Sequence, residues 1–243
     1  MASEYLKKKY KDVKPEEKRE LTPEERRKNW WHYHKWHVAA GAVLIALAAG
    51  LLWEVLGIGR VDPDYQAAYV GRYSLPEETA QALQEGLASL GEDLNGDGVV
   101  SVRLNQYPTD YGADAEASIA SQTALMADLV SCESCLFLLE DPEAFLQNGP
   151  ILRRLDGSLP EEDEKVPVEE LALPWSQCPA LAGLPLGEYR YGLPSGEALT
   201  GDSQALLSGL YVGRRGFWTE RTCAWPEGCD ALWEKMTEGA EAP

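Results

Sequence analysis

Hydrophobic residues are concentrated in one continuous run near the start of the chain. From Val38 to Ile58 the residues are apolar or small except Glu54. A helix of this length spans about 30 Å, the thickness of the hydrocarbon core of a bilayer. A core helix would show a polar face, and a signal peptide would follow a short leading segment, whereas 37 residues precede this run. The pattern therefore predicts one uncleaved transmembrane helix at 38–58, with the lipid bilayer as its partner.

Basic residues predict the orientation of this helix. Residues 1–37 contain eleven Lys and Arg residues, whereas only Arg60 and Arg72 lie close behind the apolar run. Positive charge is retained on the cytoplasmic side of membranes. We therefore expect a cytoplasmic basic and aromatic tail at 1–37, a plasma-membrane location, a linker at 59–64 and an extracytoplasmic domain at 65–243.

Apolar patterns of strand and helix length alternate after the linker. The order strand, helix, strand, helix, strand implies right-handed crossovers and a parallel sheet covered on both faces. We thus predict an α/β fold with a single-lobe, mainly parallel sheet and helices on both faces, preceded by the transmembrane helix. The predicted strands cover 65–73, 99–107 and 135–139; the helices cover 77–90 after a capping box at Ser74–Glu77, 113–130 with Ile119, Leu125, Met126 and Leu129 buried, and 228–237 with Leu232, Trp233 and Met236 buried. Residues 157–185 are expected to be mostly loop, and 187–192 and 206–217 to hold further strands.

Charge and histidine distribution exclude several functions of the exported part. The net charge of the chain is −18, and residues 38–243 contain eleven basic and thirty-three acidic residues. Such a domain repels phosphate backbones, so nucleic acid is excluded as a partner. All three histidines lie between His32 and His37. Histidine-dependent hydrolase chemistry and imidazole-based zinc sites are therefore excluded after the anchor.

The five cysteines all follow the apolar run, where an oxidising exterior favours disulfides. Cys223 and Cys229 are close enough in the sequence to form a local disulfide, although spacing alone leaves the connectivity open. Cys132 and Cys135 have the spacing of a redox pair, but they lie between a predicted helix and the next strand, which favours a structural role.

Residues 93–98, Asp-Leu-Asn-Gly-Asp-Gly, match the first half of an EF-hand-type calcium loop. The candidate ligands are Asp93, Asn95, Asp97 and Ser101. The twelfth position, where such a loop has a bidentate Glu, is Leu104. The alternative is a turn, because Asn-Gly and Asp-Gly tolerate positive φ angles.

Ligands of parallel sheets bind beyond the carboxyl ends of the strands. The predicted strands therefore place a candidate ligand site at six residues, with Asp141 also expected to cap the following helix. These residues are Arg72, Tyr73, Ser74, Tyr107, Glu140 and Asp141.

The pattern between Tyr65 and Asp156 resembles half of the amino-terminal lobe of type II extracytoplasmic solute-binding proteins. It has a first strand, a helix after Leu-Pro-Glu-Glu, a Val-rich strand, a helix ending in Leu-Met-Ala-Asp-Leu and an apolar strand that ends in Glu-Asp. Such proteins have two lobes, and this chain is long enough for one. The chain also resembles membrane-anchored proteins of Gram-positive gut bacteria. The resemblance implies a solute-binding fold.

These patterns lead to two functional hypotheses. The first is a membrane-anchored extracytoplasmic domain that binds a partner protein or a small solute without catalysis. The alternative is an extracytoplasmic enzyme that uses carboxylates, with or without calcium, such as a carbohydrate-active hydrolase. Two opposed carboxylates about 5–10 Å apart in a deep pocket would favour the enzyme.

Overall fold

The structure is a computed structural model that describes residues 22–55, 62–110, 112, 114–161, 164–192, 198–216 and 226–240. The described residues belong to two units, which divide the chain between residues 61 and 62. The predicted tail before residue 22, the end of the predicted anchor with the start of the linker at 56–61, and Cys223 lie outside the described residues.

The first unit contains the helix α2 (Pro23–Val55). Thr22 and Glu25 form a capping box at its start: the Thr22 amide donates to the Glu25 carboxylate at 3.0 Å, and the Glu25 amide donates to the Thr22 hydroxyl at 3.4 Å. The helix then continues into the apolar run as far as Val55. The segment Pro23–Leu52 has a mean hydropathy of 1.7 in its most apolar window, so α2 is long and apolar enough to cross a membrane.

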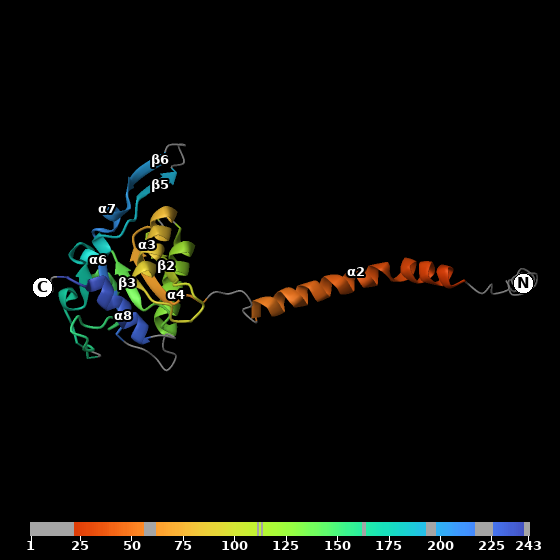
Figure 1. Ribbon diagram of the computed structural model, residues 1–243, viewed down its shortest axis with the longest axis horizontal. Helices are drawn as coiled ribbons and strands as arrows, with labels where there is room; N and C mark the ends of the chain where they lie inside the picture. The colour runs from red at the N-terminus through yellow and green to blue at the C-terminus, as the bar shows by residue number, and fades with distance from the viewer. Residues whose placement is uncertain are drawn as a thin grey trace, which may run out of the picture. The chain divides into compact units, whose positions relative to one another are not determined.

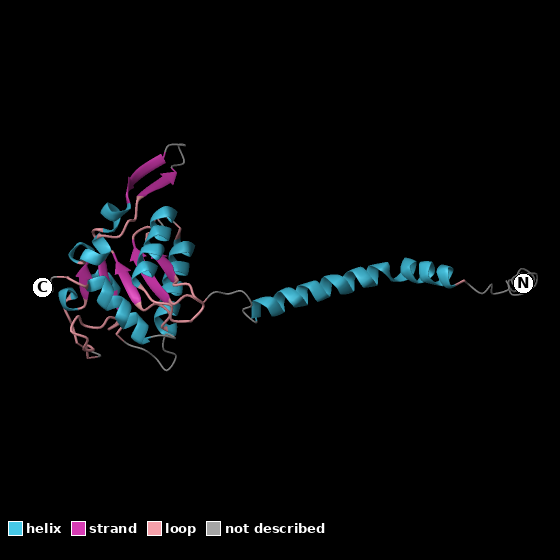
Figure 2. Cartoon of the chain, in the orientation of Figure 1, coloured by secondary structure: helices cyan, strands magenta, loops and turns pink. Residues whose placement is uncertain are grey.

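The second unit is a mixed α/β domain with a central five-stranded sheet (Figures 1 and 2). The strand order is β2-β1-β3-β7-β4. The strand β1 pairs in parallel with both β2 and β3, whereas β7 runs antiparallel between β3 and β4, so the sheet is mostly parallel. The strands are β1 (Tyr65–Gly71), β2 (Val102–Pro108), β3 (Leu136–Leu139), β4 (Ala172–Pro174) and β7 (Tyr211–Arg214).

Alternating side chains of the sheet enter two separate hydrophobic clusters. Ala67 and Leu138 belong to one cluster, whereas Ala68 and Phe137 belong to the other. The first cluster includes residues of α3 (Glu77–Leu90), α6 (Pro179–Ala182), α7 (Ser203–Leu207) and α8 (Pro226–Thr237); the second includes residues of α4 (Ala115–Ser131) and α5 (Pro142–Leu146). Helices thus pack on both faces.

A two-stranded sheet projects from the rest of the domain (Figure 1). It consists of β5 (Glu188–Gly192) and β6 (Ala198–Asp202), which pair antiparallel. Its base is attached to the domain, because the Ser203 amide donates to the Gly187 carbonyl at 3.0 Å and the Ser203 hydroxyl lies 2.9 Å from that of Thr79 on α3.

Several local predictions are confirmed and others are wrong. The alternating elements from β1 to β3 and the burial of Leu232, Trp233 and Met236 are confirmed. The capping box at Ser74–Glu77 is wrong, because Pro76 is the N-cap of α3 and Ser74 lies too far back to cap the helix. Ile119 and Met126 are 64% and 40% exposed rather than buried. The segment 157–185, expected to be mostly loop, contains only short elements between its loops: β4, α6 and two 3₁₀ turns, Val168–Glu170 and Trp175–Gln177.

Candidate ligand site at the carboxyl edge of the sheet

The strand order reverses at β1, and this places a candidate site at the carboxyl ends of β1 and β3. The connection from β1 to β2 passes through α3, whereas the connection from β2 to β3 passes through α4, on the other face. Beyond Gly71 the chain leads to α3 on one face of the sheet, and beyond Leu139 it leads to α5 on the other face. Ligands of α/β sheets typically bind in the crevice at such a reversal.

Glu140 connects the two strand ends. Its amide donates to the Val70 carbonyl at 3.0 Å, which continues the pairing of β1 with β3, and its Oε2 accepts the Arg72 amide at 2.5 Å. Gly71 leaves the necessary space: a Cβ atom there would lie 2.1 Å from the Tyr69 hydroxyl and 3.0 Å from Glu140 Oε2. The carboxylate and the Tyr69 hydroxyl therefore approach the same point at the end of β1.

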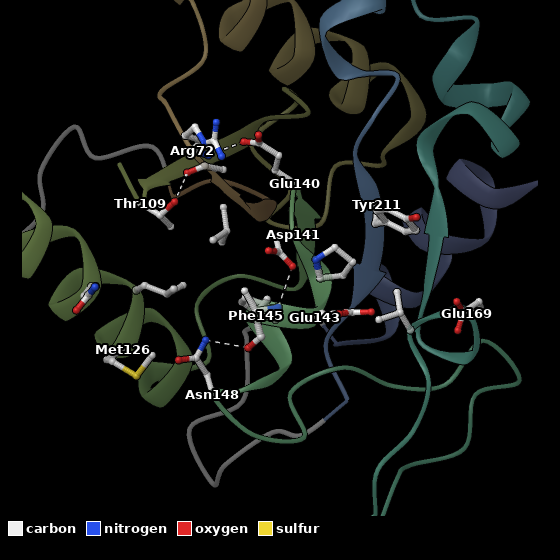
Figure 3. Close-up of a pocket in the computed structure, with 17 residues that line it drawn as sticks. Arg72, Thr109, Met126, Glu140, Asp141, Glu143, Phe145, Asn148, Glu169 and Tyr211 are labelled. Carbon is white, nitrogen blue, oxygen red and sulfur yellow. Dashed lines mark hydrogen bonds between the residues drawn. The ribbon is translucent and has the colours of Figure 1, made fainter. Parts of the chain in front are cut away.

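One cavity of about 960 Å³ opens on the α4 side of this edge (Figure 3). Arg72 and Glu140 lie next to each other in it, with Met126 of α4 at one side and Tyr211 of β7 at another. The polar lining is mixed, and further carboxylates and amides come from Asp141, Glu143, Glu169, Gln122 and Asn148.

A second cavity of about 1060 Å³ lies against the projecting sheet. Glu140 lines this cavity as well as the first. Tyrosines and leucines dominate the lining, together with carboxylates at its rim. The residues with functional side chains are Tyr69, Tyr73, Ser74, Glu77, Glu78, Asp110, Glu140, Tyr189, Arg190 and Tyr191.

The predicted ligand residues fall into three groups. Arg72, Glu140 and Asp141 line the first cavity, and Tyr73 and Ser74 line the second. Asp141 also caps α5, as expected, because its Oδ1 accepts the Ala144 amide at 2.9 Å. Its predicted role as a cap is confirmed.

Tyr107 has a different place from the other predicted ligand residues, since it lines neither cavity. It is buried, and its hydroxyl donates to Asp128 Oδ2 at 2.7 Å. Burial, together with this hydrogen bond to a carboxylate, raises the pKa of Tyr107. Tyr107 is therefore part of a buried polar cluster and not of the candidate site.

The calcium-like loop uses its oxygens within the chain. Asp93 accepts the Gly96 and Gly98 amides at 2.7 and 2.8 Å, Asn95 accepts that of Asp97, and Asp97 accepts that of Val99. Ser101 donates its amide to Asp64 at 2.7 Å. In the described part of the chain, no group of three or more His, Cys, Asp or Glu side chains is placed to hold a metal ion. The calcium prediction therefore gains no support from the geometry, which is that of a hydrogen-bonded turn.

The predicted disulfide between Cys223 and Cys229 cannot be followed, since Cys223 lies outside the described residues. Among the cysteines that the structure describes, no two sulfurs are at disulfide distance. Cys132 ends α4 in the left-handed conformation with φ 56°, and both it and Cys135 are buried beside the start of β3. Burial raises the pKa of the Cys178 thiol to about 11.

Sequence patterns missed three of the four tyrosines of the second cavity, Tyr69, Tyr189 and Tyr191. Tyr69 points into the α3 face from the middle of β1, so its hydroxyl reaches the strand end only because Gly71 follows two residues later. Tyr189 and Tyr191 lie on a hairpin that only the tertiary fold brings near α3. The available signals were the Tyr-X-Gly pattern at 69–71 and the alternating tyrosines at 189–191.

No protein-family model matches the chain, and neither a curated protein sequence nor a solved structure matches it significantly.

Proposed function

We propose that the chain is a single-pass membrane protein whose extracytoplasmic α/β domain binds a ligand at the carboxyl edge of its sheet, without catalysis. The observation that carries this proposal is the position of Glu140, which joins β1 to β3 and lines both cavities at the point where the strand order reverses. The resemblance of the sequence pattern to half of a solute-binding lobe also predicts a ligand-binding domain, and it remains a prediction.

The membrane part of the proposal is supported by α2. The apolar half of this helix follows residues 1–37, which contain eleven Lys and Arg residues. Such an excess of positive charge favours a cytoplasmic N-terminus. The exposed side chains Trp30, Trp31 and Trp36 lie at the boundary between the basic and apolar parts, where aromatic residues favour the membrane interface. A reporter enzyme active only outside the cytoplasm, fused after Pro243, should therefore be active.

Ligand binding should be tested on the full chain in detergent micelles. Thermal melts with a panel of amino acids, short peptides, sugars, nucleotides and amines would identify a solute that raises the unfolding midpoint. A ligand at one hundred times its Kd should raise the midpoint by about 5–10 °C. The shift should disappear in Glu140→Ala for a ligand of either cavity, and in Arg72→Ala for a ligand of the first cavity. It should persist in Glu116→Ala, a carboxylate on α4 that lines neither cavity.

Three results would overturn parts of this proposal. A cytoplasmic reporter would refute the topology. A shift that survives both edge variants would place the ligand elsewhere on the domain. Turnover of a glycoside that is lost in Glu140→Gln would favour the carboxylate enzyme over a binding domain.

A further inference from the structure

The second cavity has an apolar wall formed by one face of the projecting sheet. Tyr189 and Tyr191 alternate along β5 and so point to the same side, and Leu199 of β6 lies opposite Tyr191. Tyr191 and Leu199 remain 54% and 53% exposed. A two-stranded sheet has little stability of its own, so an apolar face left open toward a cavity favours a function in binding.

The rim of the same cavity is acidic. Among the described lining residues, four carboxylates stand against one cationic side chain, Arg190. Strand alternation places Arg190 on the opposite face of β5 from the two tyrosines. The domain as a whole is acidic as well, so both the local and the long-range field attract cations. The carboxylates are Glu77, Glu78, Asp110 and Glu140.

A buried polar group points to a ligand with hydrogen-bond donors. Tyr69 is only 5% exposed, and its hydroxyl reaches the end of β1 beside Glu140. Within the described part of the chain this hydroxyl makes no hydrogen bond, and Tyr69 lines the cavity. Of the two Glu140 oxygens, Oε2 accepts the Arg72 amide and Oε1 has no hydrogen bond among the described residues. The Tyr69 hydroxyl and the Glu140 carboxylate therefore lie close together at the end of β1, and both residues line the cavity.

The start of α3 also borders this cavity, and a helix N-terminus would attract an anion. Two features of this helix start reduce the attraction for an anion. Glu77 and Glu78 already place two negative charges on the first turn of α3. The amide of Leu75 just before the helix is used by Gln106, whose Oε1 accepts it at 2.8 Å.

We propose that the cavity between the β5–β6 sheet, α3 and the end of β1 binds an organic cation, in which an ammonium group is carried on an apolar body. The ammonium group donates to Glu140 Oε1 and to the Tyr69 hydroxyl oxygen. The apolar body packs against Tyr191, Leu199 and the other side chains of the wall, where tyrosine faces add cation–π attraction. This assignment rests on the proposed function and specifies its ligand class.

The protonation state of Tyr69 agrees with this role. Burial raises the pKa of Tyr69 to about 12, and the nearby charge of Glu140 acts in the same direction. The hydroxyl therefore stays neutral at physiological pH, and its oxygen remains available as an acceptor. A bound cation would lower this pKa, because it favours the phenolate.

The test compares four probes of similar size on the full chain in detergent by titration calorimetry. They are 3-phenylpropylamine, benzyltrimethylammonium, 3-phenylpropanoate and 3-phenylpropanol. Both cations should bind, and the carboxylate and the alcohol should bind at least tenfold more weakly. Affinity for the cations should fall as salt is raised, because the attraction is partly long-range.

Matched variants separate the parts of the site. Glu140→Gln should weaken 3-phenylpropylamine at least tenfold while its amide oxygen still accepts the Arg72 amide, whereas Glu143→Gln, which changes the same charge in the first cavity only, should have no effect. Tyr69→Phe should weaken 3-phenylpropylamine about tenfold but benzyltrimethylammonium less than twofold, because the quaternary ion has no N–H group to donate. Tyr191→Ala should weaken both cations about three- to fivefold.

Each outcome decides the inference. Absence of binding by both cations, or equal binding of the anion and the alcohol, overturns it, and so does equal loss in Glu140→Gln and Glu143→Gln. Melts of each variant without probe exclude unfolding as the cause of a loss. The broader solute panel decides the proposed function separately: a different solute whose effect requires Arg72 or Glu140 would leave that function in place while refuting an organic cation as the ligand.

Discussion

The carboxylates at the two ends of the central sheet differ in burial and in the number of hydrogen bonds that they accept. At the amino end, Asp64 directly precedes β1 and is 3% exposed, and its two oxygens accept the amides of Leu94, Asn95 and Ser101 at 2.8, 3.1 and 2.7 Å. At the carboxyl end, Glu140 directly follows β3, is exposed, and accepts one amide. The number of N–H groups that surround a carboxylate thus separates a structural group from one that is open to a ligand.

Asp128 is a second buried carboxylate whose oxygens are used within the chain, and it supports the distinction between structural carboxylates and one that is open to a ligand. Asp128 accepts the Ser134 amide at 2.8 Å, the Ser134 hydroxyl at 2.5 Å and the Tyr107 hydroxyl at 2.7 Å, and it forms an ion pair with Arg215 at 3.5 Å. The Asp128 and Arg215 side chains are 1% and 3% exposed. This cluster joins α4, β2, the start of β3 and the end of β7, so it fixes elements that are far apart in the sequence.

The largest effect is expected for Asp128→Ala. This variant removes the Asp128 carboxylate from the buried guanidinium of Arg215, and breaking a buried ion pair in this way costs about 3–5 kcal/mol. Chemical denaturation of the full chain in micelles, followed by the fluorescence of the domain, would measure the free energy of unfolding. Glu133→Ala is the control, since this exposed carboxylate lies in the adjacent turn and should change stability by less than about 0.5 kcal/mol. A similar loss in both variants would refute the special role of the buried pair.

The next largest effect is expected for Asp64→Asn, which replaces one acceptor oxygen by a donor facing amide groups. We expect a loss of about 2–3 kcal/mol at neutral pH. Burial alone would raise the pKa of Asp64, but the amides of Ser101, Leu94 and Asn95 together lower it. Because the folded pKa is below the unfolded value, this stabilisation is present above pH of about 4 and is lost as the pH falls through the folded pKa.

The pH dependence provides the measurement for Asp64. Unfolding titrations between pH 7 and pH 2 should show a steeper acid decline for the natural chain than for Asp64→Asn. Asp62→Asn serves as the control, because Asp62 is exposed two residues earlier. Parallel curves for the natural chain and Asp64→Asn would mean that the loop contacts of Asp64 contribute little in solution.

A smaller effect is expected for Tyr107→Phe, which removes one hydrogen bond to Asp128 and keeps the ring. The loss should be about 1–1.5 kcal/mol. Binding of 3-phenylpropylamine should stay unchanged, since Tyr107 lines neither cavity. A variant with natural stability and weakened binding would return Tyr107 to the ligand site, where the strand-end pattern first placed it.

Tyr107 also illustrates what sequence can predict for this fold. Local patterns predicted the alternation from β1 to β3, because each element depends on residues close in the chain, and the rule for strand ends then indicated Arg72 and Glu140. The direction of a long side chain at a strand end does not depend on residues close in the chain. Tyr107 turns toward α4 because Asp128 offers its hydroxyl an acceptor. The strand β7 was predicted in outline, but its antiparallel insertion beside β3 depends on contacts with residues about 75 positions earlier.

The candidate site was predictable to the same extent. Glu140 and Arg72 follow from the rule for strand ends, whereas the tyrosine wall requires a hairpin whose base is held by Ser203 and Thr79. No local pattern reports that contact. Ile119 and Met126 failed for a related reason: α4 presents a narrower face to the sheet than its apolar residues suggest, and only Leu125 among the four predicted residues is fully buried.

The smallest change in stability is expected for Glu140→Gln, at the carboxyl end of the sheet. The amide oxygen of Gln still accepts the Arg72 amide, so the free energy of unfolding should fall by less than about 1 kcal/mol. The same substitution at the amino end, Asp64→Asn, should cost at least twice as much, because several donors depend on that carboxylate. Paired denaturation of the two variants measures the difference. If Glu140→Gln proved as destabilising as Asp64→Asn, the Glu140 carboxylate would be needed to hold β1 and β3 together. It would then be a structural group and not one that is available to a ligand.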